Sequence, residues 1–328
     1  MENIDFLGLL PCALKVPFQE ALGAYVKELE KCEDVSTLHY SLVGNANNGL
    51  SFFTELKEKN DLNVLPDMIM APGFNSFYYQ NIINKCKESK SIQASVPESM
   101  NPLWLDLDLI DPFNLYSVIG FNPTVLLVDR TNDKSLPLPE KWSDLLEPEF
   151  EKKLAIRGSN PTKEEKKIEF CEGILLNTYK DHGEEGINKL GKSVNWSLHP
   201  SQMVKMAGKR GEGPSISAIP YSFAKLVKCN ENISIVWPKD GAIVNPITLL
   251  VKDIRNKQSK IMNDFLFSDE VGELFVKIGF PSIHSNKNHK LNDDTSFKWL
   301  GWDFIHENDL AKLKPKLNDI FLQSYMSK

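Results

Sequence analysis

The sequence predicts an α/β protein of two lobes, and three observations lead to this fold class. Predicted strands and helices alternate along both halves of the chain, which is typical of parallel sheets covered by helices on both faces. The length of 328 residues exceeds what one small core needs and suffices for two. Two long apolar strands, at residues 116–128 and 242–251, are each able to pass from one lobe to the other. Two such crossings form a hinge.

The first lobe is expected to begin with three units, each made of a short apolar strand, a loop and an amphipathic helix. The strands are expected at residues 4–10, 37–43 and 68–71. The helices that follow them are expected at residues 17–29, 50–59 and 77–86. Ligands of such sheets bind beyond the carboxyl ends of the strands, so the loops after these strands are candidate binding segments.

The second lobe repeats this alternation between the two crossings. Its strands are expected at residues 154–156, 216–219 and 233–237, with a capped helical turn at 142–150 and a helix beginning near Thr162. After Lys252 apolar residues recur at helical spacing, so we expect the C-terminal tail to form helices that complete the first lobe. The expected boundaries are residues 1–118 plus 247–328 for lobe 1, and residues 119–246 for lobe 2.

Composition and charge exclude several classes of protein. Hydrophobic residues make up 41% and charged residues 25%, the balance of an ordinary globular protein. The net charge is −6, and Lys and Arg are scattered among Asp and Glu without a basic stripe, so no nucleic-acid partner is expected. The first ten residues lack the basic region and long apolar run of a signal peptide, and no apolar stretch reaches the roughly 20 residues that span a bilayer.

Cysteine usage indicates the compartment. The five cysteines are odd in number and include no CxxC pair, which disfavours both a disulfide framework and a one-segment zinc site. They are Cys12, Cys32, Cys86, Cys171 and Cys229. As it stands, the sequence therefore predicts a cytoplasmic protein. A removed leader would instead place it in the periplasm or outside the cell.

Several motifs resemble those of the type II solute-binding proteins of ABC transporters. They lie at residues 142–150 (WSDLLEPEF), 153–156 (KLAI), 219–223 (IPYSF), 237–243 (WPKDGAI), 245–246 (NP) and 265–272 (FLFSDEVG). Their order and spacing are similar to the branch that contains ferric iron, polyamine, thiamine and phosphonate binders. The resemblance, which covers about residues 4–285, implies a periplasmic-binding-protein-like type II fold and a small ligand in a cleft between the lobes. It also implies hinge closure on binding and a membrane component of an ABC transporter as partner.

One position departs from the ferric-binding members of this branch. Those members have two adjacent tyrosines where this chain has Tyr221 and Ser222. One hard oxygen donor is therefore missing, which disfavours a site for a bare Fe(III) ion. Tyr78 and Tyr79 are also adjacent, but they lie in a predicted helix of the other lobe and do not replace the missing donor.

The candidate ligand-binding residues lie on the loops and crossings named above. They are Pro11, Cys12, Asn45, Gly73, Phe74, Asn75, Ser159, Asn160, Tyr221, Ser222, Asp240 and Asn245. Tyrosine offers a flat apolar face with one polar group, glycine permits close backbone approach, and asparagine both donates and accepts hydrogen bonds.

Other roles remain open for several of these residues. A tight turn explains residues 73–75 equally well, and helix capping explains Ser159 and Asn160, which would otherwise help to bind an anion at a helix start. Tyr221 has the alternative role of a corner tyrosine that bonds to the backbone. Trp104 precedes the first crossing and is either a wall of the cleft or a core residue.

Two roles also remain open for Cys12. Its place after Pro11, at the carboxyl end of the first predicted strand, suits a thiolate that binds a soft metal or an iron–sulfur cluster. The other role is that of a small buried hydrophobic residue. Such a metal or cluster is the one cofactor candidate that the sequence offers.

Residues with catalytic spacing are missing from the sequence. The six histidines never pair at metal-ligand spacing, and neither a Ser-His-Asp order nor a nucleophile elbow occurs. We therefore expect a binding protein and not an enzyme. The first alternative is a cytoplasmic metal or iron–sulfur carrier that uses Cys12, and the second is an enzyme built on the same fold.

Overall fold

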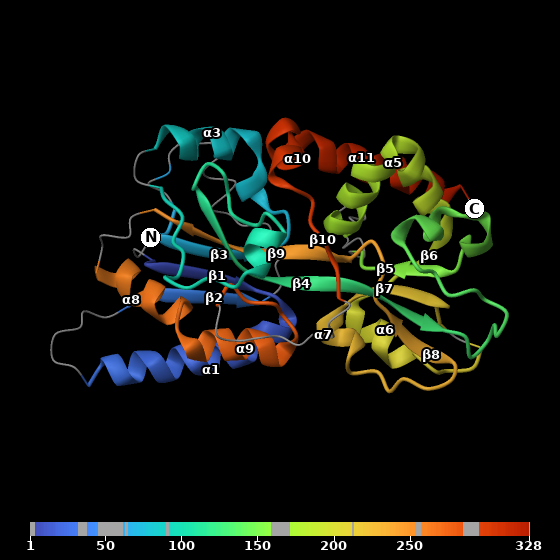
Figure 1. Ribbon diagram of the computed structural model, residues 1–328, viewed down its shortest axis with the longest axis horizontal. Coiled ribbons are helices and arrows are strands. Elements are labelled where there is room, and N and C mark those ends of the chain that lie inside the picture. Colours follow the sequence, from blue (N-terminus) through green and yellow to red (C-terminus); the bar gives the residue numbers. More distant parts are fainter. Residues whose placement is uncertain are drawn as a thin grey trace, which may run out of the picture. The chain divides into compact units, whose positions relative to one another are not determined.

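The structure, a computed structural model, divides the chain into two compact units (Figure 1). It describes residues 4–31, 38–44, 62, 65–89, 92–158, 171–211, 213–252, 257–284 and 295–327. Unit 1 consists of Met1–Phe121 and Pro246–His289, and unit 2 consists of Asn122–Asn245 and Lys290–Lys328. The expected lobe boundaries in the two crossing strands lie within a few residues of these.

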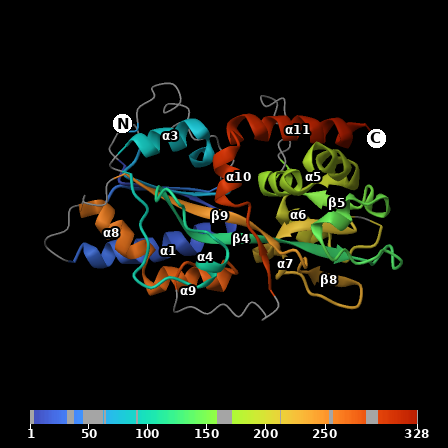
Figure 2. The ribbon, with the colours of Figure 1, turned by 45° about the horizontal axis from the view of Figure 1, so that its top comes forward.

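In the described part of unit 1, three strands run in parallel and a fourth strand is antiparallel to one of them. β1 (Phe6–Leu10) pairs in parallel with β2 (Tyr40–Gly44) and with β3 (Met68–Pro72), and β3 pairs antiparallel with β9 (Ala242–Val251). Every residue of β1 is buried, as expected for a strand covered on both faces. Figures 1 and 2 show α3 on one side of these strands and α1, α8 and α9 on the other.

Two helices of unit 1, α1 (Cys12–Leu29) after β1 and α3 (Gln80–Glu88) after β3, follow the expected strand–loop–helix order. The described residues of unit 1 also form the 3₁₀ turn η2 (Ser76–Tyr78), α4 (Leu103–Asp106), α8 (Lys257–Leu266) and α9 (Asp269–Ile278). Helix α1 begins five residues before Pro17, the expected start of this helix. The expected helix at residues 50–59 lies outside the described residues.

Unit 2 is built on a mixed sheet in which four strands run in the same direction. β5 (Leu154–Ile156) pairs in parallel with β6 (Val194–Ser197) and β7 (Ile216–Pro220). The crossing strand β4 (Tyr116–Asp129) pairs antiparallel with β7 and with β8 (Ile233–Val236). The carboxyl ends of β5, β6, β7 and β8 therefore lie at the same edge of the sheet. The short strand β10 (Phe297–Lys298) pairs in parallel with the start of β9.

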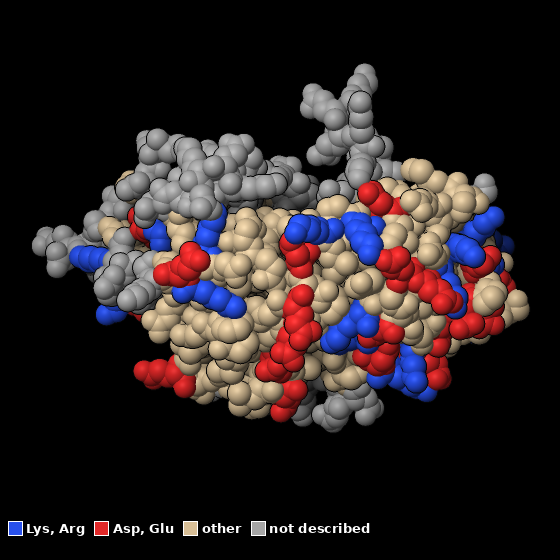
Figure 3. Space-filling view, turned by 90° about the horizontal axis from the view of Figure 1, so that it is seen from above, with Lys and Arg blue, Asp and Glu red and all other residues tan. Residues whose placement is uncertain are grey.

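The remaining elements of unit 2 are helices and 3₁₀ turns. They are η3 (Trp142–Leu146), η4 (Pro148–Phe150), α5 (Glu172–Ser193), α6 (Pro200–Met206), α7 (Tyr221–Ala224), α10 (Trp302–Glu307) and α11 (Leu310–Met326). The helix expected to begin near Thr162 falls outside the described residues. On the face in Figure 3, Lys and Arg side chains are interspersed with Asp and Glu side chains.

The C-terminal tail differs from the expected lobe assignment. We placed residues 247–328 in lobe 1, but α10 and α11 belong to unit 2, where α11 lies along α5 (Figures 1 and 2). Lys314 forms an ion pair of 2.5 Å with Glu172 of α5, and Ser324 donates a hydrogen bond to Asn188 of α5. Helical spacing of apolar residues predicts a helix with a buried face, but it does not predict which surface that face packs against. Of the helices in the tail, α8 and α9 belong to unit 1, and α10 and α11 belong to unit 2.

Two consecutive residues of β9 are held by different units. In unit 2, Asn245 Nδ2 donates to Thr124 Oγ1 at 2.9 Å and to Asn122 O at 3.1 Å. In unit 1, Pro246 O accepts a hydrogen bond of 2.7 Å from Gly73 N. The peptide that joins Asn245 to Pro246 is therefore the point at which β9 leaves the hydrogen bonds of one unit for those of the other.

Candidate functional site

Aromatic and basic side chains follow the parallel strands of unit 2 at the edge where these strands end. Arg157 follows β5, His199 follows β6 by two residues, Tyr221 and Ser222 follow β7, and Trp237 follows β8. We call these five residues the unit 2 edge. In α/β sheets this edge is where ligands bind, because loops and helix starts converge there.

Two aromatic rings of the edge form a partly exposed wall. The rings of Tyr221 and Trp237 meet edge to face with centroids 5.5 Å apart, and Phe297 of β10 meets Trp237 in the same way at 5.5 Å. The indole Nε1 of Trp237 donates to Ser296 O at 2.6 Å. Both Tyr221 and Trp237 are half-buried against the core of unit 2, so their orientation is fixed while part of each ring stays accessible.

Arg157 places a positive charge at this edge. Burial and then the charge of Arg157 lower the pKa of His199 below its usual value. Burial raises the pKa of Cys171, the residue before α5, while the charge of Arg157 opposes that rise. The charge of Arg157 therefore acts on one group at the start of α5 and on one at the start of α6. Helix starts also carry partial positive charge, so this part of the edge favours an anion.

Three buried polar side-chain atoms at or near the edge have no hydrogen-bond partner among the described residues. Ser222 is 5% exposed, and its hydroxyl Oγ is buried without a hydrogen-bond partner among the described residues. The same holds for Ser197 Oγ at the end of β6 and for Asn122 Oδ1 on β4. Buried polar groups in proteins are nearly always hydrogen-bonded, so each of these atoms, although closed to solvent in the structure, has the capacity for a further polar partner.

His199 itself caps a helix. Its Nδ1 accepts a hydrogen bond of 3.2 Å from Ser201 N in the first turn of α6, and its ring meets that of Phe223 edge to face. Accepting this bond requires an unprotonated Nδ1, which agrees with the lowered pKa of His199. The imidazole is therefore a neutral member of the edge.

In unit 1, the residues after β1 are accessible. Pro11 precedes α1 without a side-chain cap, and Cys12, the first residue of the helix, is exposed. The alternative role of Cys12 as a buried hydrophobic residue is therefore wrong. The described residues contain no group of three His, Cys, Asp or Glu side chains that could hold a metal ion, so Cys12 gains no such co-ligands within this part of the chain.

The loop after β3 is a structured turn. Gly73 has a positive φ of 71° with open space around its Cβ position, and Asn75 Oδ1 accepts from Phe77 N at 2.9 Å. Phe74 has 0% exposure, and its ring packs on that of Tyr78 with centroids 5.7 Å apart. The expectation that Phe74 contacts a ligand needs correction, because its side chain belongs to the core.

Two further aromatic candidates are also core residues. Tyr78 is fully buried and shares a hydrogen bond of 2.5 Å with Thr248 Oγ1, so it does not supply the donor that Ser222 lacks. Trp104 is 1% exposed and donates to Val118 O at 2.5 Å, which confirms its interpretation as a core residue.

The remaining candidates have structural partners or lie outside the description. Asp240 accepts a hydrogen bond from Trp142 N at 3.2 Å and lies 3.7 Å from Lys298 Nζ. Asn245 joins the two crossing strands, as described above. Three candidates fall outside the described residues: Asn45, Ser159 and Asn160.

Sequence reasoning did not select Arg157, His199 or Trp237 as site residues. Arg157 directly follows a predicted strand, a position that by itself marks a candidate, whereas Trp237 was expected as the last residue of the strand at 233–237. His199 was missed because β6 (VNWS) is too short and too polar to be recognised as a strand.

Comparison with known proteins gives the family of the chain. The family model of bacterial extracellular solute-binding proteins matches residues 63–308. A search of curated proteins found no match. Among the described residues, no helix has the length and apolar character needed to cross a membrane.

Solved structures share the fold along nearly the whole chain. Apo ferric ion-binding protein A of Pasteurella haemolytica is 12% identical with a TM-score of 0.66, and the alignment covers 99% of this chain and 100% of that one. The Trichodesmium protein IdiA (FutA), in complex with iron and citrate, is 13% identical with a TM-score of 0.61, covering 97% and 99%. The periplasmic binding protein AfuA of Actinobacillus pleuropneumoniae, with fructose-6-phosphate bound, is 15% identical with a TM-score of 0.60, covering 98% and 99%.

These similarities confirm the expected type II fold. The extracellular setting of the family does not support the cytoplasmic expectation, and it agrees with the alternative location. Because the family model matches well over half of the sequence, the chain belongs to the bacterial extracellular solute-binding proteins.

Proposed function

We propose that this protein binds a small organic anion at the unit 2 edge and delivers it to the membrane component of an ABC transporter. The observation that carries the proposal is the coincidence of three features at one sheet edge. These are the charge of Arg157 beside two helix starts, the buried hydroxyl of Ser222, and the wall formed by Tyr221 and Trp237. The first two suit an anionic group, and the aromatic wall suits an organic body.

An organic anion fits these residues better than a bare ferric ion. Tyr221 is the one phenol at its position, because Ser222 follows it, and Fe(III) favours several hard anionic oxygen donors. Two of the compared structures contain organic anions, namely citrate and fructose-6-phosphate. They support the ligand class for this chain without fixing the compound.

We also propose that the two units close around the solute by rotation at the crossing strands. The support is the change of hydrogen-bond partners between Asn245, whose side chain bonds to unit 2, and Pro246, whose carbonyl oxygen bonds to unit 1. Small-angle scattering should show a smaller radius of gyration with bound solute than without. An unchanged profile at saturation would contradict closure.

Isothermal titration calorimetry with fructose-6-phosphate, citrate and neutral fructose tests the ligand class. We expect an anion to bind and fructose to bind far more weakly. Arg157→Gln should weaken anion binding by about tenfold or more, because hydrogen bonds to charged groups contribute roughly 1.5–3 kcal/mol. Ser222→Ala should weaken it by a smaller factor.

The matched control is Arg210→Gln, which removes an exposed arginine elsewhere in unit 2 and should leave the affinity unchanged. Equal losses in both arginine variants would indicate a nonspecific charge effect and would refute a site at the edge. Binding of fructose as tight as that of the anions would refute the anionic class.

A further inference from the structure

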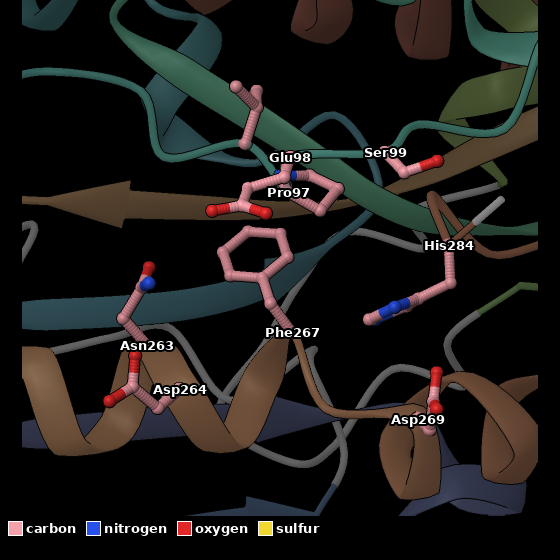
Figure 4. Close-up of a pocket in the computed structure, with 9 residues that line it drawn as sticks. Pro97, Glu98, Ser99, Asn263, Asp264, Phe267, Asp269 and His284 are labelled. Carbon is pink, nitrogen blue, oxygen red and sulfur yellow. The ribbon is translucent and has the colours of Figure 1, made fainter.

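Unit 1 contains a pocket of its own, away from the loops that follow its parallel strands. Its volume is about 490 Å³, which lies within the range of small-molecule sites. Figure 4 shows that its walls come from an extended segment, from helix α8, from the start of α9, and from one histidine. The lining residues are Val96, Pro97, Glu98, Ser99, Asn263, Asp264, Phe267, Asp269 and His284.

The lining of the pocket is rich in acidic side chains. Glu98, Asp264 and Asp269 contribute three carboxylates, and the lining contains neither lysine nor arginine. Within the described residues, none of the three carboxylates forms an ion pair or a side-chain hydrogen bond. A cation bound in this pocket would therefore meet negative charge and no competing lysine or arginine of the lining.

The lining also has an aromatic centre. Phe267 is partly exposed, and Figure 4 shows its ring between Glu98 above and Asp264 and Asp269 below, with His284 beside it. The rings of Phe267 and His284 have centroids 6.2 Å apart. A ring face of this kind attracts cations and also covers apolar groups.

Hydrogen bonds of neighbouring residues, from both backbone and side-chain atoms, hold the walls of the pocket in place. Asn101 N donates to Ile283 O at 2.7 Å, and Asn101 Nδ2 donates to Ser282 O at 3.1 Å, which holds the segment before His284. Ser95 Oγ donates to Asn263 Oδ1 at 2.5 Å on the opposite wall. A preformed pocket loses little conformational entropy when it binds a small molecule.

The spacing of the acidic groups argues against a metal ion. All nine lining residues are described, and no group of three His, Cys, Asp or Glu side chains among the described residues is close enough to hold a metal ion. The lining therefore suits an organic cation, whose charged group is attracted by the carboxylates while its apolar body contacts the aromatic ring.

We propose that this pocket is a second binding site, which takes a small organic ammonium ion with an apolar body. The carboxylates of Glu98, Asp264 and Asp269 attract the ammonium group electrostatically, and the apolar body contacts Phe267. This site is separate from the unit 2 edge in both residues and ligand charge, so it does not depend on the proposed function.

Calorimetric titration with n-pentylammonium chloride, 1-pentanol and magnesium chloride tests the proposal. We expect the ammonium ion to bind with an affinity that falls as salt is added, and 1-pentanol to bind far more weakly because it lacks the charge. The double variant Glu98→Gln and Asp269→Asn should weaken pentylammonium binding by roughly tenfold, since each exposed carboxylate contributes a few-fold. Phe267→Leu should weaken it as well.

The control variant Glu270→Gln removes an exposed carboxylate next to Asp269 that does not line the pocket, and it should bind as the unchanged protein does. Arg157→Gln should also leave pentylammonium binding intact, which separates this test from that of the unit 2 edge. Magnesium binding as tight as that of pentylammonium, equal losses in Glu270→Gln and the double variant, or no binding of pentylammonium at millimolar concentration would each overturn the proposal.

Discussion

Asn245 is the side chain whose removal tests most sharply how the crossing strands are held. Asn245→Ala deletes the hydrogen bonds of 2.9 Å to Thr124 Oγ1 and 3.1 Å to Asn122 O, while a third contact of 3.4 Å to Ile243 O is too long to count for much. At about 1 kcal/mol for each of the two good bonds, the free energy of unfolding of unit 2 should fall by about 2 kcal/mol. For a unit of this size, that loss lowers the melting temperature by about 4–8 °C.

Thermal unfolding followed by circular dichroism, with calorimetry to resolve the two units, measures this change. Asn232→Ala is the matched control in unit 2, because the one side-chain bond that Asn232 donates is 3.5 Å long and leads to exposed Glu231. The control should lose less than about 0.5 kcal/mol. If Asn245→Ala melts at the temperature of the control, the amide does not tie the two crossing strands together, and the proposed position of the hinge loses its support.

Two further perturbations follow from the described contacts. Gly120→Ala should destabilise unit 1 by about 1–3 kcal/mol in urea unfolding, because the added Cβ would lie 2.5 Å from the ring of Phe275. The control Gly23→Ala has open space at its Cβ position and should be neutral or stabilising. Equal effects of the two variants would contradict the close packing of Phe275 on Gly120. Burial and the charge of Arg157 lower the pKa of His199, so the unfolded state binds more protons below about pH 6.5 and the free energy of unfolding should fall as the pH drops through that value. His199→Asn should remove this part of the pH dependence, and an unchanged pH profile would contradict the assigned surroundings of the imidazole.

The regular elements of the fold could be predicted where a physical pattern is local. β9 has the predicted bounds Ala242–Val251, and β5 has the predicted bounds Leu154–Ile156, because apolar residues dominate both segments, as in strands that are buried on both faces. The start of α1 was placed five residues too late, because the helical spacing of apolar residues was recognised only from Phe18 onward. The position of α11 could not be predicted, since the apolar face of a helix does not specify its partner.

The candidate site could be predicted in its location more than in its members. Strand ends marked Tyr221 and Ser222 correctly as part of an edge, because sheet direction follows from strand–helix alternation. Whether a loop aromatic points into the core depends on tertiary packing, so the burial of Phe74 was not visible in the sequence. The role of Trp237 depends on its contact with Phe297, sixty residues away in the chain, which no local pattern indicates.

The most direct measurement is a crystal structure of the protein with the solute that it retains through purification, identified by mass spectrometry. The account predicts an organic anion whose charged group lies within hydrogen-bond distance of the Arg157 guanidinium and of Ser222 Oγ, with its body against Tyr221 or Trp237. A neutral solute, a bare metal ion, or a solute that makes no contact with the unit 2 edge would contradict it.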